Sequence, residues 1–191
     1  MARLIWKAFI LTVVMTLLTG VVYPLAVTGL AQVFFYSQSN GSIIFRNVTP
    51  AGSALIGQRF AVPEYFHTRL SVTGKTEYDA MASAGSNLGP TNKKLLESIS
   101  ERVNTIRLEN SLNNEAVPSD LAMSSASGLD PQISPEAAFI QAQRVARARG
   151  MTLQEVRELI NRRIESPDLG MLGKPRVNVL LLNLDLDKQN K

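Results

Sequence analysis

Two glycine- and serine-rich stretches contain the residue types with which a chain can bind an anion. They are SAGSNLGPTN at residues 83–92 and SSASGLDPQISPE at residues 124–136. Backbone N–H groups in such turns can form anion nests, and a following helix N-terminus adds partial positive charge. The same residues also permit positive φ and cap helices. The candidate residues, for either an anion nest or an interface turn, are Gly85, Ser86, Asn87, Gly89, Ser125, Ser127 and Gly128.

The serines of these stretches raise two alternative functions. A membrane-anchored hydrolase would need a base within hydrogen-bond reach of a serine nucleophile, and neither GxSxG nor SxxK surrounds these serines. An anchored binding protein for a small anion would need no such base. Neither stretch has the lysine spacing of a phosphate-binding loop or a GxGxxG pattern. Rigid turns that shape a surface are therefore the preferred interpretation.

For three further groups of polar residues, the sequence predicts a structural role or a solvated position rather than a binding site. His67 is the single histidine, and one histidine does not make a zinc site of the usual kind, so we expect it to pack or to hydrogen-bond. Asp185 and Asp187 would share one face of a strand, where we expect them to be solvated beside Lys188. The cluster Arg144, Arg147 and Arg149 is expected to be a solvated helix surface near a C-terminus.

The N-terminal segment predicts a membrane anchor. Residues 8–30 are apolar apart from threonines, glycines, one proline and one tyrosine, and no charged residue stands between Lys7 and Arg46. This run matches the roughly 20 residues that span a bilayer core and is longer than the apolar part of a signal peptide. Arg3 and Lys7 precede it, which places the N-terminus in the cytoplasm. We expect an anchor at residues 1–35 and an extracytoplasmic domain at residues 36–191.

The rest of the chain predicts a small α+β domain with a mixed sheet and about three helices. Strands are expected after residue 40, at residues 54–60 with Gly57 at a bulge or close approach, and at the C-terminus in RVNVLLLNLDLDK, which would pair with the early strands. Helices are expected after Asn92, from Ser134 to a stop at Gly150, and after a capping box of Thr152 and Glu155. The formal net charge of +4 is too mild for a nucleic-acid footprint, and cysteine is absent.

Five motifs in order behind one span resemble a known family. YFHTRLS, YDAMASAGSNLGPTN, SSASGLDPQISPEAA, QRVARARG and VNVLLLNLDLDK are similar to the C subunit of the Kdp potassium-transporting ATPase. The resemblance covers nearly the whole chain. It departs at Leu70, where the family usually has proline, while His67, Arg69 and Ser71 remain.

The resemblance implies a single-pass accessory subunit without chemistry of its own in the bacterial plasma membrane. Its partners would be a channel-like potassium subunit and a P-type catalytic subunit, and this chain lacks the DKTGT motif that the catalytic subunit needs. The family is described as a catalytic chaperone that raises the ATP affinity of the pump, so ATP is implied as a ligand by this resemblance alone. No metal is expected. We expect the turns around Gly85 and Gly128 to shape the surface that meets the channel-like subunit.

Overall fold

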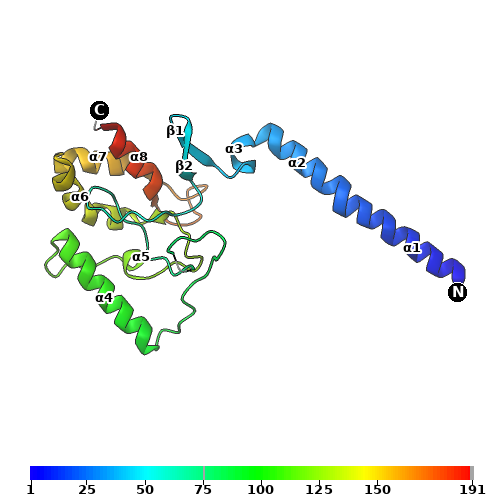
Figure 1. The fold of residues 1–191 in the computed structure, drawn as a ribbon, viewed down its shortest axis with the longest axis horizontal. Coiled ribbons are helices and arrows are strands. Elements are labelled where there is room, and N and C mark those ends of the chain that lie inside the picture. The colour runs from blue at the N-terminus through cyan, green and yellow to red at the C-terminus, as the bar shows by residue number, and fades with distance from the viewer. Residues whose placement is uncertain (75, 190–191) are drawn as a thin grey trace. The chain divides into compact units, whose positions relative to one another are not determined.

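The computed structural model describes residues 1–74 and 76–189 and divides the chain into two compact units, Met1–Ile43 and Ile44–Lys191. The first unit is a long apolar helix followed by the short helix α3 (Tyr36–Ser39), and the second mixes helices with short strands (Figure 1). This confirms the expected α+β class with one N-terminal apolar helix. The assignment of residues 36–191 to an extracytoplasmic domain stays a prediction.

The apolar helix is continuous from Ala2 to Phe34 and is long enough to cross a membrane. It consists of α1 (Ala2–Leu17), a π-helical turn η1 (Leu18–Val22) and α2 (Tyr23–Phe34). Pro24 stands in the first turn of α2 and has no N–H to donate to a carbonyl of the preceding turn. The wider π-helical turn η1 lies directly before α2. The hydroxyls of Thr12 and Thr19 donate to the carbonyls of Ala8 and Met15 within the helix.

A β-hairpin follows, made of β1 (Ile43–Arg46) and β2 (Thr49–Ser53). The strand expected at residues 54–60 is wrong, because this segment is irregular. Its glycine was correctly assigned to a close approach. The Gly57 N–H donates to the Leu129 carbonyl at 2.8 Å, and a Cβ on Gly57 would lie 2.8 Å from the Asp130 carbonyl oxygen.

The three expected helices form with the caps that the sequence indicates. They are α4 (Lys93–Asn110), whose N-cap is Asn92, α6 (Pro135–Arg149), and α7 (Leu153–Arg163), and a short helix α5 (Ser119–Ala122) lies between the first two. The Ser134 hydroxyl caps α6, and Gly150 ends it with φ of 65°. Thr152 and Glu155 form the complete capping box of α7. Local side-chain and glycine chemistry therefore defines these helix ends.

The C-terminal segment is mostly helical, so the predicted long strand is wrong. Only β5 (Arg176–Asn178) is extended, and α8 (Val179–Gln189) follows at once. The central strand β5 pairs antiparallel with β3 (Gln132–Ile133) and with β4 (Ile164–Glu165), and not with the early strands. The buried positions Val179, Leu182, Asn183 and Leu186 recur at the three- and four-residue spacing of a helix face, and the leucines and the lysine of this segment are good helix formers.

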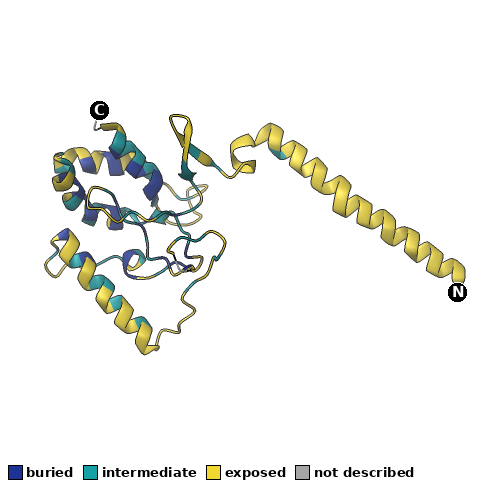
Figure 2. Ribbon diagram, in the orientation of Figure 1, coloured by how far each residue is buried: buried dark blue, intermediate teal, exposed yellow. Residues whose placement is uncertain are grey.

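The core lies where α6 packs against α7 and α8 follows β5 (Figure 2). Four alanines on α6 are buried, and their small side chains allow close packing of neighbouring elements. Phe66 is fully buried although it comes from an irregular segment. Its N–H and carbonyl are both bound by the side-chain amide of Asn183 on α8, at 2.9 and 3.0 Å. This pair of hydrogen bonds satisfies backbone groups that no strand partner serves.

Two of the three clustered arginines are partly buried and bound to acceptors within the fold rather than fully solvated, which corrects the sequence expectation. Arg144 donates to the carbonyls of Pro63 and Tyr65 at 2.6 and 3.0 Å, and burial lowers its pKa to about 10. The Arg149 side chain is only 4% exposed, and it donates to the Glu64 carbonyl at 2.7 Å. Long apolar stems allow these side chains to cross the core surface and to reach acceptors beyond it.

The paired carboxylates are also bound rather than solvated, and they lie on a helix rather than on a strand. Asp187 accepts from Arg149 and Arg46, both at 2.8 Å, and from the Tyr65 hydroxyl at 3.0 Å. Asp185 pairs with Arg163 at 2.5 Å and with Lys188 at 2.9 Å. These ion pairs fix α8 to α7, α6 and the hairpin.

Replacing Asp187 by alanine is expected to lower the free energy of unfolding by about 3–5 kcal/mol, because Arg149 would keep a buried charge without its partner. The control is Asp168→Ala, which removes a carboxylate that is 68% exposed and paired with Arg176, and little loss is expected there. Urea unfolding of the full chain in detergent measures both. Equal losses for the two variants would contradict the account.

Candidate functional site

The two glycine-rich stretches meet in the structure. The Ala84 N–H and the Ser83 hydroxyl both donate to the Ser127 carbonyl, each at 3.0 Å. A Cβ on Gly85 would lie 2.8 Å from the Ala126 carbonyl oxygen, so only glycine allows this approach. Ser86, Asn87 and Gly89, which follow in the first stretch, are exposed. We name the contact between residues 83–85 and 126–128 the paired turns.

Several polar groups of the second stretch are already engaged. The Gly128 N–H donates to the Ser125 carbonyl at 3.3 Å, and the Leu129 N–H donates to the Ser127 hydroxyl at 3.2 Å. Ser125 is buried, and its hydroxyl lies 3.5 Å from that of Ser127. These bonds use N–H groups that an anion would otherwise need. The role of the paired turns as a binding nest or an interface remains a prediction.

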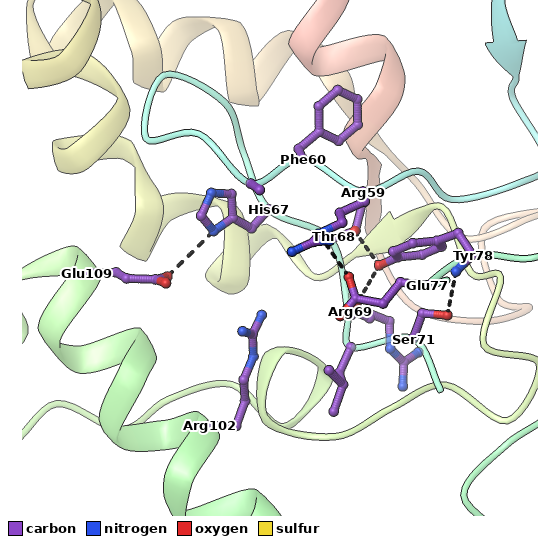
Figure 3. Close-up of a pocket in the computed structure, with 12 residues that line it drawn as sticks. Arg59, Phe60, His67, Thr68, Arg69, Ser71, Glu77, Tyr78, Arg102 and Glu109 are labelled. Atoms are coloured by element: carbon purple, nitrogen blue, oxygen red, sulfur yellow. Dashed lines mark hydrogen bonds and ion pairs between the residues drawn. The ribbon is translucent and has the colours of Figure 1, made fainter. Parts of the chain in front are cut away.

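A polar cleft of about 250 Å³, which the sequence did not predict as a unit, lies beside these turns (Figure 3). We define it by the side chains that carry its chemistry, which come from the loop before α4 and from one face of α4. The defining residues of the polar cleft are Arg59, His67, Thr68, Arg69, Ser71, Glu77, Tyr78, Arg102 and Glu109. His67, Arg69 and Ser71 belong to the motif YFHTRLS, whereas Arg59, Arg102 and Glu109 are too distant in sequence to be grouped with it.

Most charges of the cleft are paired. Arg59 and Glu77 lie 3.2 Å apart, and Arg69 contacts Asp130 at 2.7 Å. Arg102 donates through Nε to the Leu121 carbonyl at 3.4 Å, and its guanidinium lines the cleft. Figure 3 shows Glu109 and Arg102 on α4 facing the His67–Ser71 segment. The Nε of Arg69 is buried and has no hydrogen-bond partner within the described residues.

His67 is held by hydrogen bonds, as the sequence analysis expected. Its backbone N–H donates to Gln141 Oε1 at 2.7 Å, and ring Nε2 lies 3.3 Å from the Val62 carbonyl oxygen. Nδ1 lies 3.5 Å from Glu109. Burial, and then the positive charge of Arg144, lower the pKa of His67 below its ordinary value. The imidazole is therefore neutral at physiological pH.

Tyr78 and Ser71 join the cleft to the paired turns. The Tyr78 hydroxyl hydrogen-bonds to the Arg69 carbonyl and to the Thr68 hydroxyl, and burial raises its pKa. Its backbone has φ of 63°, and its N–H donates to Ser71 Oγ at 2.9 Å. Ser71 Oγ in turn donates to the Gly128 carbonyl at 2.7 Å. A shift of the paired turns would therefore displace Ser71 and Tyr78, which line the cleft.

This arrangement is suited to recognition rather than to bond-making. The Ser71 hydroxyl donates to a carbonyl, and both ring nitrogens of His67 face other acceptors, so the two do not form a nucleophile and base pair. Leu70, which replaces the proline usual in the family that the sequence resembles, forms an isolated parallel bridge with Ser124. Within the described residues, no group of three metal-ligating side chains lies together.

Comparisons with known proteins match nearly the whole chain. The family model described as KdpC, the K+-transporting ATPase c chain, matches residues 5–188. A potassium-transporting ATPase KdpC subunit from Polaromonas naphthalenivorans is 53% identical over 98% of this chain and 95% of its own length. Proteins of the same name from Koribacter versatilis and Mycobacterium bovis are 51% and 49% identical, over 93% and 98% of this chain and 91% and 100% of their own lengths.

Valine in place of Gly128 is expected to destabilise the paired turns by about 1–3 kcal/mol. The position has φ of +66°, and a Cβ there would lie 2.7 Å from the Ala84 carbonyl oxygen. Gly89→Val is the control, because no heavy atom lies within 4 Å of a Cβ at that position. Urea unfolding and the yield of any assembled complex are compared for the two variants. If Gly128→Val behaves like Gly89→Val in both measurements, the turns are not rigid elements.

Acidification is expected to destabilise the fold through His67. Because its pKa in the folded state lies below the ordinary histidine value of 6.5, the unfolded chain binds the proton more tightly. Stability is therefore lost as the pH falls from 6.5 toward the folded-state pKa. His67→Asn should reduce this loss in urea unfolding, and the histidine NMR signal should titrate below 6.5. A titration midpoint above that value would overturn the prediction.

Proposed function

We propose, from the premise that this chain belongs to the KdpC family of potassium-transporting ATPase c chains, that it helps to assemble and stabilise such a pump. It is an accessory subunit of the potassium-transporting ATPase and not the catalytic one. The observation that carries the proposal is the family match over residues 5–188, which includes both the apolar helix and the folded domain. The chain acts by binding other subunits, and a polar recognition cleft suits that role.

The partners are a channel-like potassium subunit and a P-type catalytic subunit, with the folded domain outside the cell membrane. The orientation is supported by Arg3 and Lys7 before the helix and by the absence of another basic residue until Arg46. In this orientation the polar cleft and the paired turns face the extracytoplasmic side. They therefore meet the channel-like subunit rather than the cytoplasmic parts of the catalytic subunit.

The anchor contributes a second contact. No residue of the helix Ala2–Phe34 is buried within the chain, so lipid or partner helices must cover it. Ala8, Thr12, Thr16 and Gly20 recur at intervals of four residues and form a narrow stripe of small side chains. Such stripes allow the backbones of two membrane helices to approach closely. The stripe is the surface of the anchor on which a partner helix packs.

Any increase in the ATP affinity of the pump is transmitted through this helix contact. Hydrolysis by a P-type pump takes place in the cytoplasm, whereas the proposed orientation places the folded domain on the opposite side. Direct contact between this domain and nucleotide would need the reverse orientation. The helix of this chain can instead stabilise the conformation of the catalytic subunit that binds ATP tightly, provided that it binds that conformation more strongly than the others.

Co-purification tests the proposal. A C-terminal tag on the full chain, expressed in potassium-starved cells, is used to recover complexes from membranes in mild detergent. Recovery of a channel-like potassium subunit together with a P-type catalytic subunit is expected. If the chain is recovered alone under conditions that preserve other membrane complexes, the proposal fails.

The stripe makes a separate prediction. Gly20→Leu should lower the recovery of partner subunits, because the added side chain separates the packed helices. Gly29→Leu is the matched control: it lies outside the four-residue repeat, and at both positions an added Cβ would meet nothing within 4 Å beyond its own chain neighbours and helix backbone. Quantitative co-purification compares the variants. Equal recovery with both would show that the stripe is not a contact.

A further inference from the structure

We propose that the hairpin β1–β2 rests on the phospholipid surface where the anchor leaves the membrane, with Phe45 and Val48 inserted at the boundary between the lipid headgroups and the acyl chains. The side chain of Phe45 is 61% exposed and that of Val48 is 91% exposed, although both are apolar. Such side chains are stabilised where water gives way to a bilayer. The inference rests on the proposed function only in requiring that the helix Ala2–Phe34 spans a membrane.

The length of the anchor places its far end at the membrane surface. Phe34 follows Lys7 by 27 residues, and a helix of that length spans about 40 Å, which matches a bilayer with its headgroup regions. With Lys7 at one surface, Phe34, Phe35 and Tyr36 lie at the other. All three are exposed aromatic residues, which are enriched at membrane interfaces.

The covalent chain then keeps the hairpin close to that surface. Ile43 follows Phe34 by nine residues, so the hairpin starts at most about 30 Å from it even if the connection is fully extended. The connection is shorter, because Tyr36–Ser39 is helical and the Ser42 N–H donates to the Ser37 carbonyl at 2.9 Å. The hairpin is therefore the part of the folded domain that the chain ties most closely to the headgroups.

Contacts within the folded domain fix the hairpin while its apolar residues Phe45 and Val48 stay exposed. Arg46 is bound to Asp187 at 2.8 Å, and Asp187 is itself fixed by the buried Arg149. At the turn, Asn47 has φ of 58°, and the Thr49 hydroxyl donates to the Arg46 carbonyl at 3.0 Å. The ion pair ties Arg46 at the end of β1 to α8, while Val48 at the turn remains exposed. Little ordering is needed when the tip meets the lipid.

The test uses tryptophan emission from the full chain in phospholipid nanodiscs. Trp6 is the only native tryptophan and is first replaced by phenylalanine. Phe45→Trp and Val48→Trp then report on the hairpin, and Leu108→Trp on α4 is the matched control, because Leu108 is an exposed apolar residue with 81% exposure that has no short link to the anchor. Each variant is measured with ordinary phospholipids and with phospholipids that carry bromine on their acyl chains.

Emission from both hairpin positions is expected to shift to shorter wavelength and to lose intensity with brominated lipid, while Leu108→Trp shows neither change. Emission typical of water at both hairpin positions would overturn the inference. So would a blue shift without quenching, which would indicate that protein covers the hairpin, or equal quenching at Leu108. This result is independent of co-purification, so the inference and the proposed function can fail separately.

Discussion

The folded domain depends on the need to satisfy two partly buried arginine side chains on α6. A buried guanidinium without acceptors is costly, and Arg144 and Arg149 find theirs on the backbone of residues 63–65 and on Asp187. In doing so they fix a segment that has no strand partner of its own. Arg149 also stacks over the Tyr65 ring, with 4.7 Å from Cζ to the ring centroid.

The polar cleft follows from this anchoring. Once residues 63–65 are fixed, Phe66 enters the core and His67 is presented to Gln141 and Glu109. The Tyr78 hydroxyl then hydrogen-bonds to the Thr68 hydroxyl and to the Arg69 carbonyl, and the Ser71 hydroxyl donates to the Gly128 carbonyl. The cleft and the paired turns are therefore one connected arrangement built on α6. Its groups are already hydrogen-bonded to one another, which suits a preformed surface for another protein.

Features that depend on local chemistry could be predicted from the sequence. Ser134, Gly150 and the pair Thr152 and Glu155 define helix ends through contacts within a few residues, so their spacing was sufficient. The C-terminal strand was wrong because a leucine-rich run fits both a buried strand and a helix. Which one forms depends on the distant Asn183 contact with Phe66.

The same limit explains the candidate site. Sequence reasoning identified His67, Arg69 and Ser71 as part of a motif, but it had no means to bring Arg102 and Glu109 of α4 opposite them. It also predicted that the clustered arginines are solvated, because their charge alone does not show that the fold brings the carbonyl groups of residues 63–65 within hydrogen-bond distance of them. The contact between the two glycine-rich stretches was likewise non-local, although both had been singled out for their composition.

The central claim is that this chain supports a potassium pump without performing its chemistry. The most direct measurement is potassium-dependent ATP hydrolysis by the proposed partners, a channel-like and a catalytic subunit, purified and reconstituted with and without this chain. We expect potassium to stimulate hydrolysis only when the chain is present. Equal potassium stimulation in its absence would contradict an accessory role in assembly and stabilisation.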